Sequence, residues 1–197
     1  MATDKRTLAY YDQNAADYAA QPADQEDCDL LKRFVALLPP GSAVLDLGAG
    51  SGWATQEFKQ AGFDVSAIDG SAGLAAQATA RTGVAVQVVR FEDIDFVDAF
   101  DGIWAAYSLH HAERGALANI LRRLKRALRP GGLVMISVKS GEEEKRDSLD
   151  RLYAHYSREA LARIITREMG LGVIHAEERS GYGADGVACE LVALIAR

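Results

Sequence analysis

The sequence predicts an α/β protein with a doubly wound, mostly parallel β-sheet. Between residues 43 and 139, short apolar runs that suit buried strands alternate with amphipathic segments of helical spacing. Directly after the first run, three glycines crowd one turn in the stretch VLDLGAGSGW, residues 44–53. Alternating strands and helices favour a parallel sheet covered on both faces, and a glycine-rich strand-to-helix turn is typical of such folds.

Composition indicates an ordinary globular chain. It has 197 residues, 49% of them apolar and 25% charged, so we expect one domain with a full hydrophobic core. No apolar run reaches the length of a membrane span, and the start MATDKRTLAYYDQNAADYAA lacks the apolar centre of a signal peptide. The two cysteines, Cys28 and Cys189, have no metal-ligand spacing and favour a reduced, cytoplasmic chain.

The elements of the core follow in order. Buried apolar runs predict strands at residues 43–47, 64–68, 84–90, 100–108 and 133–139. The first intervening helix, 53–61, ends at Gly62, and the second, 71–81, begins at the N-cap Ser71 and ends at Gly83. A third helix is indicated by leucines at helical spacing, and Pro130-Gly131-Gly132 ends it; these leucines are Leu117, Leu121, Leu124 and Leu128.

The polar faces of the third helix carry five cations, Arg122, Arg123, Lys125, Arg126 and Arg129. An RNA-binding stripe is one interpretation. A solvated face is favoured, because the helix dipole stabilises cations near the helix C-terminus. The formal net charge of −6 also disfavours a nucleic-acid partner, since phosphate binding needs clustered positive charge.

The two ends of the chain follow different patterns. Residues 157–169 predict a helix, and residues 173–178 and 187–196 predict two strands joined by the glycine-rich link SGYGADG. This hairpin should add one antiparallel edge strand to the sheet. Two helices, 4–20 and 26–38, precede the core and have no strand of their own. We therefore expect one domain, 1–197, in which residues 1–40 form a helical cap, or lid, over a core of residues 41–197.

The segment KSGEEEKRDSLDR, residues 139–151, follows the fifth strand and therefore borders the carboxyl edge of the sheet. Residues 142–144 are interpreted as a charged loop tip. Beyond them we expect a lid helix that carries Arg146, Arg151, Tyr153 and Tyr156, because segments over a rigid sheet commonly supply substrate contacts.

The glycine turn predicts a ligand. Residues 48–52 connect a strand that ends at Asp46-Leu47 to a helix whose first N–H groups are unpaired and attract anions. The second strand is followed by Asp69, whose carboxylate suits both hydroxyls of a ribose. Because the carboxyl ends of parallel strands share one edge, these features together predict a ligand that contains a nucleoside.

A dinucleotide is disfavoured as the ligand that contains this nucleoside. Counted from Gly48, the dinucleotide pattern needs glycine at its sixth position, where this chain has Trp53. An NAD-linked dehydrogenase is therefore disfavoured. The alternative interpretation, that the glycine-rich turn binds no ligand, is disfavoured by the position of Asp69 after the next strand.

Four segments, VLDLGAGSG, AIDGSAGLAAQA, FDGIWAAYSLHH and LKRALRPGGLVMISVK, resemble the class I S-adenosylmethionine-dependent methyltransferases in order and spacing. The resemblance extends from YYDQNAADYAA to beyond the fifth strand and is greatest for small bacterial, tellurite-resistance-like methyltransferases. It implies a Rossmann-like, seven-stranded sheet whose last strand is antiparallel. It also implies S-adenosyl-L-methionine as the cofactor and a small molecule as the methyl acceptor.

The resemblance also implies roles for single residues. The methionine end of the cofactor would be held by Asp46, Gly48, Ala49, Gly50, Ser51 and Gly52, with Trp53 beside them. Asp69 would bind the ribose, and the adenosine would lie beside Gly70, Ser71, Leu74, Phe91 and Glu92. Tyr10, Tyr11 and Tyr18 resemble lid tyrosines, although packing within the helices is the alternative. Members of the family often carry a glycine where this chain has Asp150, before Arg151.

Catalysis is expected to rest on SN2 alignment and exclusion of water, because the methyl group is already activated by its positive sulfur. Tyr107 is placed near the sulfonium, where the face of its ring suits a cation. His110 and His111 follow the same strand. His111 is the candidate for accepting a proton, which is needed only for a protonated nucleophile; fixing the loop by a hydrogen bond to the backbone is the favoured alternative.

A sensor that binds the cofactor without catalysis is the alternative function. An open acceptor pocket lined by Tyr107, His111 and Tyr156 would favour an enzyme. We expect no metal, because His, Cys and acidic residues show no ligand spacing. The expected partner is the small-molecule acceptor, and we expect the chain to bind neither nucleic acid nor membranes. We expect it to be a monomer or a homodimer.

Overall fold

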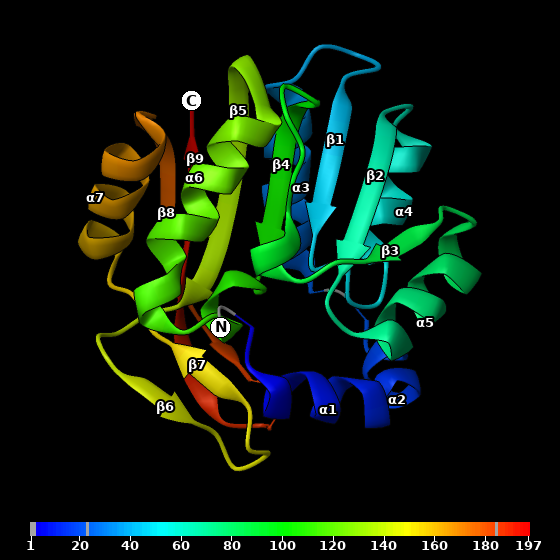
Figure 1. Cartoon of the computed structure of the whole chain (residues 1–197), viewed down its shortest axis with the longest axis vertical. Coiled ribbons are helices and arrows are strands. Elements are labelled where there is room, and N and C mark those ends of the chain that lie inside the picture. Colours follow the sequence, from blue (N-terminus) through cyan, green and yellow to red (C-terminus); the bar gives the residue numbers. More distant parts are fainter. Residues whose placement is uncertain (1–2, 23, 184) are drawn as a thin grey trace.

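The computed structural model describes residues 3–22, 24–183 and 185–197, and it confirms the doubly wound α/β class (Figure 1). Its main sheet has seven strands in the order β3-β2-β1-β4-β5-β9-β8. β1 pairs in parallel with both β2 and β4, so the chain winds outward from the first strand in both directions. The strands are β1 (Ala43–Leu47), β2 (Asp64–Asp69), β3 (Val86–Val88), β4 (Phe100–Ala106), β5 (Leu128–Lys139), β8 (Val173–Tyr182) and β9 (Ala188–Ala196).

The last strand is antiparallel, as expected, but its predicted place at the edge is wrong. β9 lies between β5 and β8 and pairs antiparallel with both. Residues 191–196 are buried, whereas β8 alternates half-buried and exposed residues, so the more apolar strand takes the interior position. In the link between these strands, Ala184 lies outside the described residues.

Two strand boundaries also differ from the prediction. β3 is shorter than 84–90, because it is the edge strand at the other end of the sheet and its residues are largely exposed. β5 begins at Leu128, five residues before the predicted 133, because Leu128 pairs with Phe100 ahead of an irregularity in the register. The third helix therefore ends at Ala127, and Leu128 and Arg129 belong to the strand.

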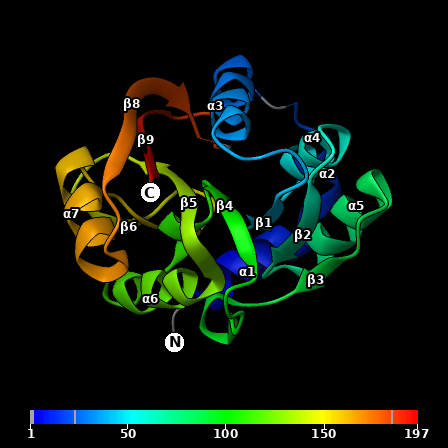
Figure 2. The same ribbon diagram turned by 90° about the horizontal axis from the view of Figure 1, so that it is seen from above.

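Helices cover both faces of the sheet (Figure 2). α3 (Gln25–Ala36) and α4 (Trp53–Gln60) pack on one face, where Phe34, Phe58 and Trp104 meet edge to face. α6 (Leu117–Ala127) and α7 (Arg158–Met169) pack on the other. Each fully buried side chain of this size stabilises the fold by about 1.5–3 kcal/mol, so both layers hold the strand ends in fixed positions.

Three of the five cations of α6 and of the strand after it have acidic partners, while Arg123 donates to the carbonyl of Ile94. Arg122 pairs with Glu168, Arg126 with Asp95, and Arg129 with Asp101. The favoured interpretation of a solvated face agrees with this arrangement, because paired cations leave little excess positive charge for a phosphate backbone.

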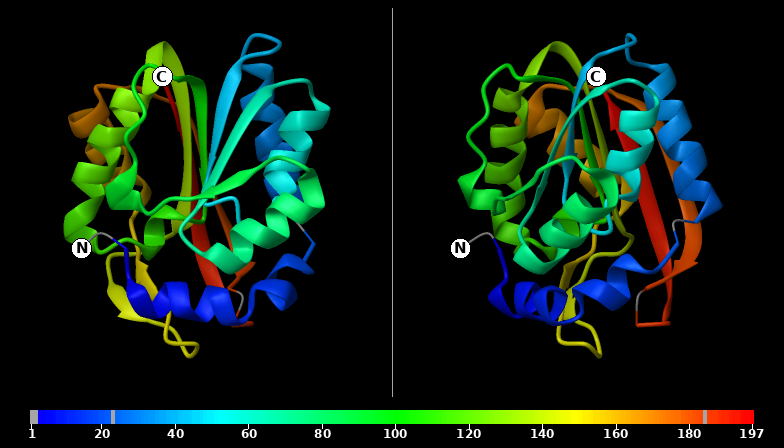
Figure 3. Two further views of the ribbon diagram at one scale, coloured as in Figure 1. Left: turned by 45° about the vertical axis from the view of Figure 1, so that its right-hand side comes forward. Right: turned by 90° about the vertical axis from the view of Figure 1, so that its right-hand side faces the viewer.

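The N-terminal cap is helical, but only part of it lies over the sheet edge. The predicted helix 4–20 is two helices, α1 (Lys5–Gln13) and α2 (Ala15–Ala19), separated at Asn14. They run across the carboxyl ends of the parallel strands, beside the start of α5 (Ala72–Thr82) (Figures 1 and 3). The predicted helix 26–38 is α3, which covers a face of the sheet instead, because it buries Leu30, Leu31 and Phe34 there.

The lid helix predicted beyond residue 142 is wrong. Residues 144–154 form a two-stranded antiparallel hairpin of β6 (Glu144–Arg146) and β7 (Leu152–Ala154), next to α1 (Figure 3). Its turn contains Asp150 with φ of 63°, a conformation that favours glycine and that Asp tolerates better than most residues. A glycine at this position would adopt this left-handed backbone conformation without strain. Within the described ranges, no helix is long and apolar enough to cross a membrane.

Candidate active site

The glycine turn joins β1 to α4 and is held by the end of β2. The amides of Gly48 and Ala49 donate to the carbonyl of Ile68 at 2.8 and 3.0 Å, and the amide of Gly50 donates to Asp69 Oδ2 at 2.9 Å. The predicted unpaired N–H groups are those at the start of α4 (Trp53–Gln60), which these three residues precede. Their amides stabilise the turn itself and tie it to the neighbouring strand.

Gly48 is needed for space. Its φ is +79°, and an added Cβ would lie 2.4 Å from the Cβ of Ser108, just after β4. The hydroxyl of Ser108 is buried and has no hydrogen-bond partner within the described part of the chain. Buried polar groups almost always have a partner, so a free hydroxyl beside an open glycine turn indicates a polar ligand.

Gly52 and Trp53 serve helix packing. A Cβ on Gly52 would meet Ala78 and Thr82 of α5 at 3.0 Å, so the close approach of α4 and α5 depends on this glycine. The ring of Trp53 packs edge to face against Trp104, with the centroids 6.2 Å apart. The tight packing that dinucleotide-binding proteins obtain from a sixth-position glycine is thus reached one residue earlier.

Two buried carboxylates lie at the turn. Asp69 accepts hydrogen bonds from the amides of Gly50 and Ser71 at 2.9 and 2.8 Å and lines the cavity described below. Asp46 accepts from Thr55 Oγ1 at 2.6 Å and does not line that cavity. Burial raises the pKa of both carboxyl groups. The pKa of Asp46 is raised to about 7, and the nearby charge of Asp69 contributes to this rise.

This shift predicts a pH-dependent effect of Asp46→Asn on stability. Because folding raises the pKa of Asp46 from 3.8 to about 7, its contribution to stability is complete below about pH 4 and is lost as the pH rises through 7. Relative to Asp46→Asn, the wild type should therefore lose on the order of 2–4 kcal/mol of unfolding free energy between pH 4 and pH 8. Urea denaturation of both proteins at several pH values measures this difference. A difference that stays constant with pH would contradict the assignment.

A cavity lies at the carboxyl ends of β1, β2 and β4, under α1. Its lining contains many of the residues predicted for the site: Tyr11, Tyr18, Gly48, Gly50, Asp69, Gly70, Leu74, Phe91, Tyr107 and His111. Other predicted residues lie outside this lining: Asp46, Ala49, Ser51, Gly52, Trp53, Ser71 and Glu92. Between the neighbours Phe91 and Glu92, it is the aromatic ring that borders the cavity, because the carboxylate of Glu92 bonds to Thr3 Oγ1.

Sequence reasoning missed a group of lining residues. Some lie at the carboxyl ends of predicted strands and were within reach of that reasoning: Leu47, Val89, Arg90, Ala106 and Ser108. Others precede or begin α1, where no motif marks them: Thr3, Asp4, Thr7 and Leu8. The second group is brought to the cavity only by the docking of the lid.

Polar contacts at both ends of α1 dock the lid. Asp12 accepts from Ser71 Oγ at 2.6 Å and from the amide of Gly73 at 3.0 Å, which ties the lid to the start of α5. At the other end, Arg146 donates to both carboxylate oxygens of Asp4 at 3.0 and 2.8 Å, and this contact lowers the pKa of Asp4. The hydroxyl of Ser71, predicted beside the adenosine, therefore bonds to the lid.

A second cavity adjoins the first. The two share three lining residues, Tyr11, Tyr18 and Tyr107. The second is lined further by Trp53, His110, Lys139, Arg151, Tyr153 and residues of the β8–β9 hairpin. The expected pocket lined by Tyr107, His111 and Tyr156 is thus replaced by one in which His110 and Tyr153 accompany Tyr107. Tyr156 is in the core, 1% exposed.

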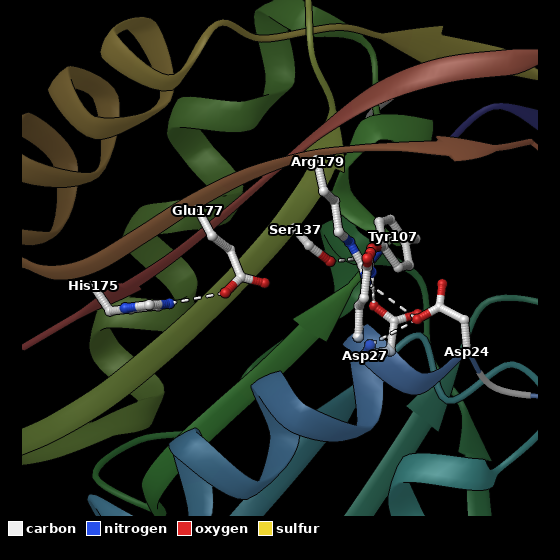
Figure 4. Close-up of polar contacts among 8 residues, drawn as sticks. Asp24, Asp27, Tyr107, Ser137, His175, Glu177 and Arg179 are labelled. Carbon is white, nitrogen blue, oxygen red and sulfur yellow. Dashed lines mark hydrogen bonds and ion pairs between the residues drawn. The ribbon is translucent and has the colours of Figure 1, made fainter.

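Tyr107 stands between the cavities in a constrained position. Its φ is 51°, and its hydroxyl donates to Asp27 Oδ1 of α3 at 2.9 Å. Arg179 reaches across from β8 and donates to both the Tyr107 hydroxyl and Asp27, as Figure 4 shows. Burial raises the pKa of Asp27 to about 6 and also raises the pKa of Tyr107. Residues from an N-terminal helix and a C-terminal strand therefore hold this one ring.

His111 is neutral and fully engaged. Its Nδ1–H donates to the carbonyl of Leu152 at 2.7 Å, so its Nε2 accepts from the hydroxyl of Tyr11 at 2.9 Å. Burial lowers the pKa of His111 to about 4. The favoured alternative, a hydrogen bond from His111 to backbone, agrees with this geometry, and the ring additionally orients Tyr11. Within the described ranges, no group of three or more His, Cys, Asp or Glu is placed to hold a metal ion.

The sheet order, the glycine turn, the acid one strand over and the helical lid define a Rossmann-like methyltransferase fold. A family profile described as a methyltransferase domain matches residues 44–132. A malonyl-[acyl-carrier protein] O-methyltransferase of Erwinia billingiae is 38% identical over 116 residues, which are 58% of this chain and 43% of that protein. An uncharacterized methyltransferase of Staphylococcus carnosus is 33% identical over 102 residues, 52% of this chain and 49% of that protein. The chain thus spans about half the length of the curated relatives it matches.

Solved structures share the whole fold. A 1,6-didemethyltoxoflavin-N1-methyltransferase of Burkholderia thailandensis, solved with 1,6-didemethyltoxoflavin and S-adenosylhomocysteine, superposes with a TM-score of 0.66. The two chains are 24% identical, and the match covers 97% of this chain and 89% of the other. The chain therefore shares the fold of this methyltransferase, and residues 44–132 match a methyltransferase domain.

Proposed function

We propose that this protein transfers the methyl group of S-adenosylmethionine to a small-molecule acceptor. The observation that carries the proposal is the pair of adjoining cavities that share Tyr11, Tyr18 and Tyr107. A methyltransferase must hold two molecules on opposite sides of one reacting carbon, and two cavities with a common wall meet that need. The likeness to the fold of a protein solved with S-adenosylhomocysteine and a second molecule supports this division.

The residues of the first cavity fit an adenosyl cofactor. Asp69 lines this cavity, and each of its carboxylate oxygens accepts one hydrogen bond from an amide. Because a carboxylate oxygen can accept more than one hydrogen bond, Asp69 can also accept from the ribose hydroxyls. Leu74 and Phe91 offer apolar surface for the adenine. The free hydroxyl of Ser108 beside Gly48 offers a polar contact for the methionine end.

The residues of the shared wall would position the reactants. When bound, S-adenosylmethionine supplies a methyl group on a positively charged sulfur. The ring of Tyr107 offers its electron-rich face to that charge, and the fixed hydroxyl keeps the ring from turning away. Tyr11 and Tyr18 exclude water, and His111 acts as a positioning residue through Tyr11. Because both ring nitrogens of His111 already form hydrogen bonds, His111 has no free nitrogen to accept a proton from the acceptor. We therefore propose alignment and desolvation as the source of the rate enhancement.

The first test is direct binding, with turnover as the second readout. Calorimetry should show that S-adenosylhomocysteine binds and that NADH does not. With S-adenosylmethionine supplied, at least one acceptor in a panel of metabolites and metalloid anions should release S-adenosylhomocysteine. Binding of NADH in its place would overturn the cofactor assignment.

A sensor that binds the cofactor without catalysis is the second candidate. It is favoured by the extent to which the lid is docked, since Asp4, Asp12 and Tyr11 each make hydrogen bonds beyond α1. The large second cavity favours the enzyme, because a sensor has no need of an acceptor site. We further propose a cytoplasmic monomer or homodimer that binds no nucleic acid, in keeping with the unbridged Cys28 and Cys189 and the paired cations of α6.

A further inference from the structure

Two cations, Lys139 and Arg151, line the second cavity, and a third, Arg179, lies beside its lining residue Tyr107; the surroundings of the three differ. Arg151 is bonded to Asp147, with Nη2–Oδ2 at 2.6 Å. Arg179, beside Tyr107 at the cavity wall, is bonded to Asp24, Glu26 and Asp27. Each of these two charges is balanced by carboxylates. Lys139 is different, because the described part of the chain places no salt bridge on its ammonium group.

Lys139 is the last residue of β5, at the carboxyl edge of the sheet. It is only 8% exposed, although it lines the cavity, and its Nζ lies 3.9 Å from the centroid of the Tyr153 ring. A cation–π contact offsets only part of the cost of removing an ammonium group from water. The ring therefore holds Lys139 in place and does not replace the missing anion. An enclosed cation without a paired carboxylate is a group arranged for an anionic ligand.

A second donor points to the same chemistry. His110 is 3% exposed and lines the cavity next to Tyr153. Its Nδ1 accepts from the amide of Lys139 at 3.2 Å, and burial lowers its pKa well below the ordinary value, so the ring is neutral and its proton is on Nε2. The Nε2–H group has no partner among the described residues and is available to a ligand. An ammonium and an N–H donor that line one cavity and both contact the Tyr153 ring suit an oxyanion.

The rest of the wall describes the body of the ligand. Aromatic rings surround the two donors: Tyr11, Tyr18, Trp53, Tyr107, Tyr153 and Tyr182. Aromatic walls favour a flat, apolar body by stacking or edge-to-face contact. A carboxylate of the hairpin tip, Asp185, approaches the same region near Gly183, but it accepts from the amide of Val187 and forms no salt bridge with Lys139.

We infer that the second cavity takes a small organic acid with a planar, apolar body, and that Lys139 and His110 bind its carboxylate. This inference rests on the proposed function, since it names the class of acceptor for the same site. The carboxylate serves as an anchor that turns another part of the molecule toward the wall shared with the first cavity. Lys139 is thereby a specificity-determining residue.

The test compares benzoate with benzamide, which have the same ring and differ in charge. Both are titrated by calorimetry into the protein saturated with S-adenosylhomocysteine. Wild type should bind benzoate about tenfold more tightly than benzamide, and Lys139→Met, which keeps the length of the side chain, should abolish that preference. Lys139→Arg should restore most of it. Lys145→Met is the matched control, because that lysine is on the exposed hairpin with its side chain 57% accessible.

The readouts separate this inference from the proposed function. If S-adenosylhomocysteine fails to bind the wild type, the proposed function is wrong, and the same titrations into the protein alone then decide whether Lys139 gives a preference for benzoate. If it binds and benzoate shows no preference over benzamide, or if Lys139→Met keeps the preference, the inference is overturned while the proposed function stands. Lys139 does not line the first cavity, so Lys139→Met should bind S-adenosylhomocysteine as wild type does, which also verifies that the variant folds.

Discussion

Asp69→Ala should weaken the binding of S-adenosylhomocysteine by about tenfold to a hundredfold. A hydrogen bond to a charged group contributes about 1.5–3 kcal/mol, and each 1.4 kcal/mol is tenfold in affinity. The substitution removes the carboxylate proposed to bind two ribose hydroxyls. It also releases the amides of Gly50 and Ser71, so the turn itself loses its tie to β2.

Calorimetry measures the affinity, and two further variants make the result specific. Asp64→Ala removes an exposed carboxylate from the opposite end of the same strand and should leave the affinity unchanged. Asp69→Asn keeps the size of the side chain and one class of acceptor, so it should fold even if Asp69→Ala does not, and its affinity should be intermediate. Unchanged affinity in both Asp69 variants, with the fold intact by circular dichroism, would show that the ribose is bound elsewhere.

Arg151→Ala should lower the free energy of unfolding by about 3–5 kcal/mol, because it leaves a buried carboxylate unpaired. The side chain of Arg151 is 0% exposed and that of Asp147 7%. Nε and Nη2 of the guanidinium both donate to Asp147 Oδ2, at 3.0 and 2.6 Å. A third group, Nη1, donates to the hydroxyl of Tyr11 at 3.2 Å, so the same arginine connects the β6–β7 hairpin to the lid.

Urea denaturation measures this effect, with a surface pair as the control. Arg126→Ala breaks the ion pair with Asp95 on the exposed face of α6 and should have little effect on stability. The double variant Asp147→Leu/Arg151→Met removes both charges and should be more stable than Arg151→Ala alone, because no unpaired carboxylate is then left buried. A loss of less than 1 kcal/mol in Arg151→Ala would mean that Asp147 finds water or another partner.

Particular elements show where sequence reasoning succeeds. The strand 43–47 and the cap of α5 by Ser71 are local features, set by apolar burial and by one side-chain oxygen, and both are confirmed. The interior position of β9 was predicted wrongly, although a continuous apolar run is typical of a strand inside a sheet. The lid helix expected beyond residue 142 failed, because charged residues in a short segment do not reveal that Arg151 will be buried against Asp147.

The candidate site divides in the same way. Asp69 and the glycine turn lie one after another along β1, α4 and β2, so spacing alone places them together. The second cavity is assembled from residues 24–27 of α3, from the ends of β4 and β5, and from the hairpins β6–β7 and β8–β9. No periodicity connects these segments, and the pairing of Arg179 with Tyr107 joins positions 72 residues apart in sequence.

The class of fold could be read from the sequence alone, and the sequence also predicted the likeness to methyltransferases and a region for binding a nucleoside. These depend on short-range order: apolar period, glycine at a turn, an acid at the end of the next strand. The folded structure was needed to show that amides of the glycine turn already donate hydrogen bonds and that both ring nitrogens of His111 form hydrogen bonds. It was also needed to show that Lys139, which has no salt bridge among the described residues, lines the second cavity. Those properties depend on which partners distant segments bring within hydrogen-bond reach, and on how much water the packing excludes around them.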